Sequence, residues 1–242
     1  MGSQSPPSAD DRGRVEGRPL LTSIDMLHIR WKVFGPLSES IEIADDARDP
    51  TSVCRPYTAD HPILHRPATE PPVSSLKVEV DGPRESVSYF LKSHQGDEDA
   101  EWTRAPDPTD EELDKARDNM FRWGDDGRGN IRVRCCNVQR PQVPPKVILT
   151  ASDQPYVTVG DYVDTVHSWL RSHREDILYA RSFWGNGCPL PGDSALYIRI
   201  LRPIKVHLLE GELEAAESVA DYTRAPVARE SMDRYMRERM QA

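Results

Sequence analysis

Hydrophobic residues recur with a period of about 3.6 positions, the period of an α-helix, along one stretch in the second half of the chain. The members of this apolar stripe are Val159, Val163, Val166 and Leu170. Thr158 stands just before the stripe and Asp161 follows Thr158 by three positions, which is the spacing of a capping box. The sequence therefore predicts a helix over residues 158–171 whose stripe faces the core.

Elsewhere apolar and polar residues alternate with a period of two, which is typical of half-buried strands. Such runs cover residues 27–33, 73–80, 131–133, 147–149, 196–200 and 204–208. The last two runs flank Pro203 and are expected to form a hairpin. A turn signal at Asp81-Gly82-Pro83 suggests that residues 87–91 return as a strand beside residues 73–80.

Further helices are expected near residues 109–121, 176–183, 212–220 and 227–240. With the strands, they indicate an α+β fold: a small, mostly antiparallel sheet packed by one main helix, with an acidic insertion and C-terminal helices. Residues 1–19 are rich in Gly, Ser and Pro and are predicted to be a disordered tail that contacts no core. The expected organisation is a single domain over 20–210, with the insertion at 92–130, and C-terminal helices over 211–242.

Charge is distributed very unevenly along the chain. From Asp97 to Asp126 there are twelve acidic and four basic residues, so this segment carries −8 of the formal net charge of −9. An acidic chain argues against a dedicated nucleic-acid-binding protein, which normally presents a basic face. The acidic segment would attract a basic protein partner, which is the interaction that the charge favours.

Four cysteines are present, and none of them forms a C-x-x-C motif. Cys135 and Cys136 are adjacent, and on a strand their side chains would point to opposite faces, which disfavours a shared metal site or a disulfide between them. The chain has neither a signal-peptide pattern at its start nor an apolar run long enough for a membrane span. We therefore expect thiols rather than disulfides, an intracellular location, cytoplasmic or nuclear, and no membrane partner.

Three segments together resemble a family of uncharacterised fungal proteins that share a domain of unknown function. Residues 67–78, Pro-Ala-Thr-Glu-Pro-Pro-Val-Ser-Ser-Leu-Lys-Val, resemble the segment before the central strand of that family. Residues 157–170 resemble its V-T-V-x-D helix, and the strand around Trp31 resembles its tryptophan-bearing first strand. The resemblance spans residues 25–205, with 92–145 intervening where the family is shorter. It implies a fold and a fungal setting but no activity.

Several residues are weighed as functional candidates. His167 lies beside the apolar stripe, and a half-buried imidazole bonded to a neighbouring loop is favoured over a catalytic role. Cys188 lies in a Gly- and Pro-rich loop with no base placed near it, and Asp125 to Asn130 lack the ligand pattern of a calcium loop. Arg171, His173 and Arg174 are expected to complement the helix dipole rather than bind an anion. No catalytic, cofactor-binding or metal-binding residue is assigned, and no cofactor is expected.

Two classes of function remain. The sequence favours a non-catalytic protein-interaction or scaffold module that uses the acidic segment, the proline-rich stretch or the C-terminal helices. The alternative is a small-ligand-binding protein, or an enzyme, whose site is assembled from residues distant in sequence. A pocket of several hundred Å³ with converging polar groups would favour the alternative, whereas a flat apolar surface would favour the module. The sequence defines no oligomeric state.

Overall fold

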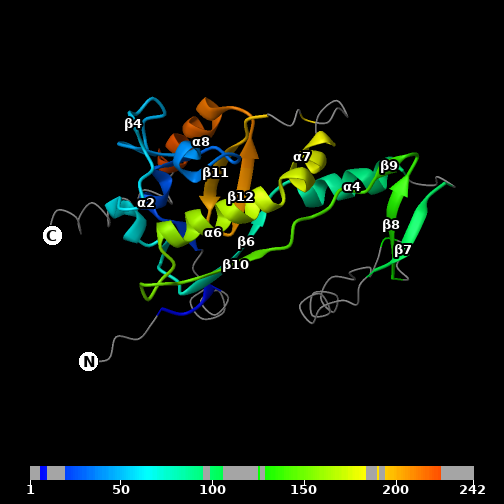
Figure 1. Ribbon diagram of the computed structural model, residues 1–242, viewed down its shortest axis with the longest axis horizontal. Helices are drawn as coiled ribbons and strands as arrows, with labels where there is room; N and C mark the ends of the chain where they lie inside the picture. The colour runs from blue at the N-terminus through cyan, green and yellow to red at the C-terminus, as the bar shows by residue number, and fades with distance from the viewer. Residues whose placement is uncertain are drawn as a thin grey trace. The chain divides into compact units, whose positions relative to one another are not determined.

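The computed structural model describes residues 6–9, 20–94, 99–105, 125, 129–183, 190 and 194–224. The protein is α+β, as predicted (Figure 1). Two compact units make up the chain: Met1–Asp81 with Pro144–Glu175 and Pro191–Ala242, and Gly82–Val143 with Asp176–Leu190. The domain boundaries expected from the sequence stay predictions. None of the described helices has both the length and the apolar character needed to cross a membrane.

The first unit contains a four-stranded sheet in the order β10-β6-β12-β11 (Figure 1). Its strands are β10 (Val147–Thr150), β6 (Ser75–Val80), β12 (Lys205–Leu209) and β11 (Tyr197–Arg202). β12 runs parallel to β6, and the other pairs are antiparallel. The predicted hairpin of the last two strands is confirmed, with a register shift between Arg199 and Arg202.

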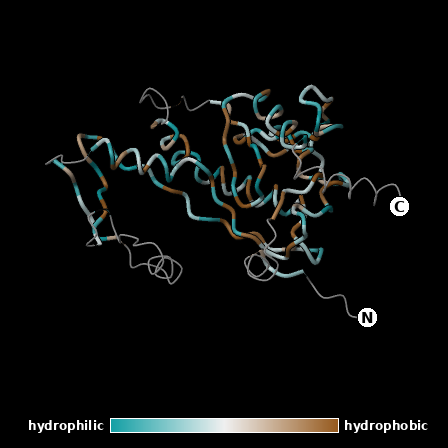
Figure 2. The backbone as a smooth tube through the Cα atoms, turned by 180° about the vertical axis from the view of Figure 1, so that it is seen from behind, coloured by the Kyte–Doolittle hydropathy of each residue, from teal (hydrophilic) through white to brown (hydrophobic). Residues whose placement is uncertain are grey.

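The alternation in the sequence gives this sheet one apolar face and one charged face. The pairing places Leu76, Val78, Val80, Leu149, Ile198, Ile200, Val206 and Leu208 on the same, buried face. On the reverse face Glu79 pairs with Lys146 and with Lys205, at 3.5 Å and 3.7 Å. Figure 2 shows hydrophobic and hydrophilic colours alternating along the strands and helices.

The predicted main helix is α6 (Val159–Ser172). Its capping box is formed: the Thr158 hydroxyl accepts from the N–H of Asp161 at 3.0 Å, and the Asp161 carboxylate accepts from the N–H of Thr158 at 2.9 Å. The predicted stripe of Val159, Val163, Val166 and Leu170 is fully buried. Tyr162 and Trp169 extend the buried face, each donating a hydrogen bond to a backbone carbonyl, of Pro203 and Pro145 respectively.

A second, three-stranded antiparallel sheet in the same unit consists of β2 (Ile29–Trp31), β3 (Ile41–Ala44) and β4 (Cys54–Pro56). The strand expected over 27–33 is shorter at its start because α2 (Ile24–Leu27) includes Leu27. Short elements complete this region: α3 (Leu37–Ser40), the 3₁₀ helix η1 (Pro62–His65), and β1 (Leu21–Thr22) paired with β5 (Thr69–Glu70). The proline-rich stretch, residues 50–72, contains three of these short elements: β4, η1 and β5.

Helix α8 (Glu212–Arg224) extends four residues beyond the helix predicted at 212–220. Its Val219 packs in a buried cluster with Leu27 and Ala47, against which Leu201 of β11 also packs. The helix predicted at 227–240 lies outside the described residues.

The described part of the N-terminal tail, residues 6–9, makes a contact that the sequence did not indicate. The backbone carbonyl of Pro7 accepts a hydrogen bond of 3.1 Å from the N–H of Ser74, directly before β6. Neither Pro7 nor Ser74 is buried, so this bond lies outside the core, and the expectation that residues 1–19 contact no core stays a prediction. The composition of the tail carries no signal for a single backbone hydrogen bond of this kind.

The second unit contains α4 (Pro83–Ser93), where the sequence analysis expected a returning strand at 87–91. That expectation is wrong, because the local signals belong to a helix. Gly82 adopts a φ of 107°, and Glu85 accepts a hydrogen bond of 3.2 Å from its N–H. Pro83 occupies the first turn, where its missing N–H costs nothing. Val87 and Phe90, three positions apart, lie on the buried side of the helix.

The same unit holds a three-stranded sheet of β7 (Glu101–Arg104), β8 (Asn130–Cys135) and β9 (Val138–Gln139), all antiparallel. It also contains α7 (Arg174–Ser182) from Asp176 onward. Ser86 of α4 donates a hydrogen bond of 2.8 Å to the carbonyl of Ala180 in α7. Within the expected acidic insertion, 92–130, β7 is the element described in full, between the end of α4 and the start of β8. The helix predicted near 109–121 lies outside the described residues.

Candidate functional site

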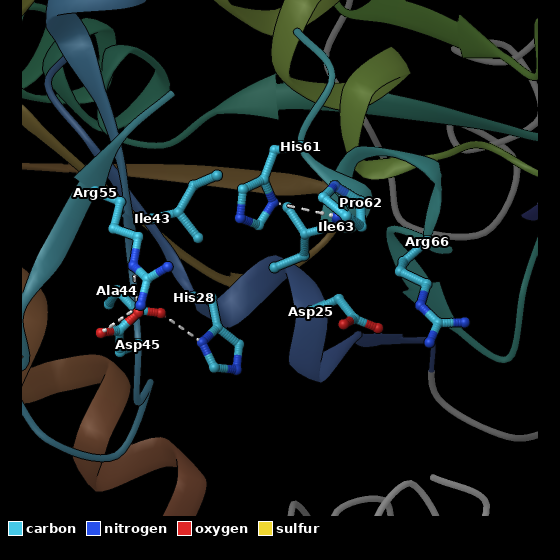
Figure 3. Close-up of a pocket in the computed structure, with 10 residues that line it drawn as sticks. All are labelled: Asp25, His28, Ile43, Ala44, Asp45, Arg55, His61, Pro62, Ile63 and Arg66. Atoms are coloured by element: carbon cyan, nitrogen blue, oxygen red, sulfur yellow. Dashed lines mark hydrogen bonds and ion pairs between the residues drawn. The ribbon is translucent and has the colours of Figure 1, made fainter. Parts of the chain in front are cut away.

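A hollow of about 320 Å³ in the first unit is the strongest candidate site in the described part of the chain. Four segments form its walls: α2 with the residue after it, the end of β3, β4, and η1 with its flanks. Its lining residues, drawn in Figure 3, are Asp25, His28, Ile43, Ala44, Asp45, Arg55, His61, Pro62, Ile63 and Arg66. This volume lies at the lower end of the range for small-molecule pockets, about 300–1,000 Å³.

Helix α2 presents an acid and an imidazole to this pocket. Ser23 caps the helix by accepting the N–H of Met26 at 3.2 Å, which fixes where the helix begins. Asp25 then falls in the first turn, where a carboxylate interacts favourably with the helix dipole. His28, three residues later, lies on the same side of the helix as Asp25. The local sequence thus places both side chains on one wall.

The hydrogen bond made by His28 determines what its ring can offer a ligand. Its Nδ1 lies 2.7 Å from the carbonyl oxygen of Ala44, the last residue of β3. A carbonyl oxygen only accepts, so Nδ1 must carry the proton. In the neutral ring Nε2 therefore holds the lone pair, and His28 offers a hydrogen-bond acceptor or a base at that atom.

His61 has the opposite tautomer. It stands at the N-cap of η1, and its Nδ1 accepts the N–H of Ile63 at 3.3 Å. Pro62 at the first position of η1 has a fixed φ that suits the turn. Because Nδ1 holds the lone pair, Nε2 of the neutral His61 carries the proton and donates. The pocket therefore contains one imidazole acceptor and one imidazole donor.

Charged groups lie at both sides of the two imidazoles in the view of Figure 3. On one side Arg55 pairs with Asp45 through two contacts, Nε to Oδ1 at 3.0 Å and a terminal nitrogen to Oδ2 at 3.3 Å. On the other side are Asp25 and Arg66. The guanidinium of Arg66 is exposed and has no side-chain partner among the described residues. It is thus the cationic group of this pocket best placed to take a ligand anion.

The backbone of Arg66 is held firmly although its side chain is exposed. Its N–H donates to the carbonyl of Ile63 at 3.0 Å, and its carbonyl accepts the N–H of Val159 at 2.8 Å. Val159 is the first residue of α6, so its N–H has no acceptor within the helix. Its bond to the Arg66 carbonyl therefore fixes the end of η1. Gly160 allows this approach, because a Cβ at that position would lie 3.2 Å from the carbonyl oxygen of Leu64.

His167, the imidazole singled out from the sequence, lies elsewhere in the first unit and is buried. Its Nδ1 accepts the indole N–H of Trp31 at 3.1 Å, and its Nε2 lies 3.0 Å from the carbonyl of Gly35. Burial is the main cause that lowers the pKa of His167. Both ring nitrogens are used within the fold, which is the structural role that the sequence analysis favoured.

The other candidates do not join the pocket. Cys188 lies outside the described residues, as do residues 126–128 of the segment from Asp125 to Asn130. Arg171 is in the last turn of α6, and His173 is its C-cap, where cations suit the dipole. The guanidinium of Arg174 lies 4.9 Å from the ring centroid of Phe34, a cation–π contact rather than an anion site.

The pocket was not predictable from the sequence, because its residues come from separate loops and element ends. The signals that were present are local: Ser23 as a helix cap, and the His61-Pro62 pair as the start of a helical turn. Neither signal indicates that positions 28 and 61 meet in space. That proximity depends on β3 pairing with both β2 and β4.

Comparison of the chain with protein-family models, with curated proteins and with solved structures finds no match in any of the three. The resemblance to the fungal family therefore stays a prediction. The class of protein is defined by the fold and the pocket alone: an α+β protein with a small polar pocket built on short elements of one unit.

Proposed function

We propose that this protein binds a small polar ligand in the pocket formed by α2, β3, β4 and η1. The observation that carries the proposal is the convergence of His28 and His61, with opposite tautomers, on a hollow of about 320 Å³. A pocket of this kind is the feature that separates the ligand-binding class from the interaction-module class. Its volume suits a small metabolite rather than a dinucleotide.

The groups in the pocket favour a particular ligand chemistry. His28 Nε2 accepts a hydrogen bond, His61 Nε2 donates one, and Arg66 offers a guanidinium fork that fits a carboxylate. The side chains of Ile43 and Ile63 add an apolar wall against which a short carbon chain can pack. A small hydroxycarboxylate carries the matching groups: a hydroxyl that can donate to His28 and a carboxylate that can accept from His61 or from Arg66.

The test is a titration of the ¹⁵N-histidine-labelled protein with malate and lactate, compared with succinate and propionate, which lack the hydroxyl group. The proposal expects the hydroxylated acids to shift the ring signals of His28 and His61 at lower concentration than their deoxy counterparts. Arg66→Met should weaken binding by about tenfold or more, since a hydrogen bond to a charged group contributes about 1.5–3 kcal/mol.

Arg48→Met is the matched control, because Arg48 is also exposed, pairs loosely with Asp46 and does not line the pocket. It should bind as the unchanged protein does. The proposal fails if none of the four acids shifts the two imidazoles. It also fails if Arg66→Met and Arg48→Met bind them equally well.

The second hypothesis, a non-catalytic protein-interaction module, is supported by a different part of the chain. It rests on the acidic segment, most of which lies outside the described residues, so that its basic partner stays a prediction. A salt-dependent capture of basic proteins that is lost when the acidic residues are neutralised would support it. Such a result would be independent of the pocket.

A further inference from the structure

The second unit contains a cluster of potential metal ligands that is separate from the pocket. The imidazole of His94 and the thiols of Cys135 and Cys136 each offer one ligand atom, and these atoms all lie within 4.8 Å of one another. His94 is the C-cap of α4, and the two cysteines stand at the end of β8. Thiolate and imidazole together are the donors preferred by zinc and other thiophilic cations.

The two adjacent thiols come together because the strand ends between them. Cys135 is the last residue of β8 and pairs with Val138 of β9, which leaves Cys136 and Asn137 as a two-residue hairpin turn. Both turn residues have positive φ, 49° and 63°, as a type I′ turn requires. The alternation of side chains stops at this turn. The expectation that the two thiols point to opposite faces is therefore wrong: their Sγ atoms are 3.8 Å apart.

This separation agrees with shared coordination of one ion. Two thiolates at zinc–sulfur distances of about 2.3 Å in a tetrahedral arrangement lie about 3.8 Å from each other. A disulfide would require about 2.05 Å between the sulfur atoms. The observed Sγ–Sγ distance of 3.8 Å therefore matches a pair of metal ligands and not a bonded pair.

The cluster is also held in place by its surroundings. The carbonyl of His94 accepts a hydrogen bond from the guanidinium of Arg132 in β8, which fixes the end of α4 against this strand. The His94 ring packs against Phe90 at 5.0 Å between centroids, which restricts its rotation. At the turn, Arg134 donates to the side-chain carbonyl of Asn137 at 3.1 Å. Ligands with restricted positions lose little conformational entropy when an ion binds.

We propose that His94, Cys135 and Cys136 bind one zinc ion through two thiolates and one imidazole. Cys135 is buried and Cys136 is exposed, so the ion would lie at the edge of the unit with a fourth position open to water. Two thiolates balance the charge of Zn²⁺, so that the complex is neutral. The ion would join the end of α4 to the β8–β9 turn and close the chain between residues 94 and 135, stabilising this unit.

The experiment titrates the reduced, chelator-treated full-length protein with Co²⁺ and then displaces it with Zn²⁺. The expected result is one equivalent of Co²⁺ with a thiolate-to-cobalt charge-transfer band that Zn²⁺ removes. Cys136→Ser and His94→Gln should each lower the affinity at least about tenfold. In Cys136→Ser the charge-transfer band should also weaken, because one thiolate is lost.

Cys54→Ser and His65→Gln are matched controls, since Cys54 belongs to β4 and His65 to η1, both in the first unit. Both should keep the band and the affinity. Cys136 and His94 are not fully buried, so their variants test binding without the packing loss expected for the buried Cys135. The proposal is overturned if the unchanged protein binds no Co²⁺ above the level of Cys136→Ser. It is equally overturned if His94→Gln leaves the spectrum and affinity unchanged.

Discussion

The buried pair of Trp31 and His167 shows how single side chains specify this fold. Each polar atom of the pair is matched: the indole N–H donates to Nδ1, and Nε2 lies at hydrogen-bond distance from the carbonyl of Gly35. A ring that accepts at one nitrogen and donates at the other must be neutral. The pair joins β2 to α6. Because Nδ1 already accepts the indole N–H, His167 cannot take a second proton without losing this hydrogen bond.

The first prediction concerns the stability of the protein in mild acid. Burial lowers the pKa of His167 below its ordinary value near 6.5, against the opposing effects of the Gly35 hydrogen bond and of Asp164, and Arg171 acts in the same direction as burial. As the pH falls through about 6.5, His167 is therefore protonated in the unfolded chain but stays neutral in the folded chain. Stability from the neutral ring is fully present above pH 6.5 and is lost as pH falls below it, by at most about 1.4 kcal/mol per pH unit.

This contribution is measured as the slope of the unfolding free energy against pH between 7.5 and 5. His167→Gln should be less stable at pH 7.5 by about 1–3 kcal/mol and should show a shallower slope. His207 must be controlled separately, because burial lowers its pKa too, against the opposing effect of Asp81 at 2.8 Å. His207→Gln should remove its own part of the slope. An unchanged slope in His167→Gln would contradict the assignment.

At the residue scale the sequence predicts His167 as a half-buried imidazole bonded to a neighbouring loop, but it does not name the partners and it underestimates the burial. Trp31 is 136 positions away, so no local spacing encodes the contact. The same limit applies to the pocket and to the cysteine pair. The sequence places the Cys135 and Cys136 thiols on opposite faces only if the strand continues through both residues, whereas in the structure a two-residue turn begins at Cys136.

At the scale of elements, the period of the hydrophobic residues predicts an element correctly where the run is long and a capping motif stands at its end. Helix α6 has both a stripe and a capping box, and it begins and ends within one residue of the prediction. Residues 87–91 offered too short a run for the period to be read. The signals for helix α4 stand before this run, at Gly82, Pro83 and Glu85, and the segment is helical because these residues form its N-terminal cap.

The second prediction tests the cap of α6. Thr158→Ala removes the side-chain acceptor for the N–H of Asp161 and should lower the unfolding free energy by about 1 kcal/mol. Thr165→Ala, in the interior of the same helix, is the control and should be neutral or slightly stabilising, since alanine is the better helix former. Urea denaturation of both variants measures the difference. Equal midpoints for the two variants would show that the cap contributes nothing.

The third prediction tests the buried face of α6. Val166 is fully buried, so Val166→Asp would place a carboxylate without a partner in the core, at a cost of several kcal/mol. Loss of the folded state by circular dichroism is expected. Ser168→Asp is the control, because Ser168 is exposed on the same helix. If Val166→Asp melts like Ser168→Asp, the packing of this face has been assigned wrongly.

At the scale of the whole molecule, the chain forms two compact units that carry different chemistry. The first holds the polar pocket, whose backbone depends on α6 through the bond between Val159 and Arg66. The second holds the His94, Cys135 and Cys136 cluster. Each unit is assembled from segments distant in sequence, which is why single-sequence periodicity could predict the α+β class but not this division.

The last prediction concerns the acidic segment between β7 and β8. The two strands pair in antiparallel register up to Arg104 and Asn130, and the N–H of Ala105 donates to the carbonyl of Gly129 at 2.8 Å. The ends of the segment are therefore adjacent in space, and closing a shorter loop between them costs little. Replacing residues 106–124 by a short Gly/Ser linker should leave a folded protein with nearly the same melting temperature.

Asp125 must be retained in that variant, because its carboxylate accepts the N–H of Arg132 at 2.8 Å and pairs with Arg140. Asp125→Ala alone should destabilise the second unit by about 1–3 kcal/mol, because it leaves Arg140 and the Arg132 N–H without this acceptor. The linker variant should keep both its response to hydroxycarboxylates and its Co²⁺ band. An aggregated or molten product would instead place residues 106–124 in the core of the second unit. Loss of the Co²⁺ band in a variant that still folds would contradict the assignment of the site to His94, Cys135 and Cys136 alone.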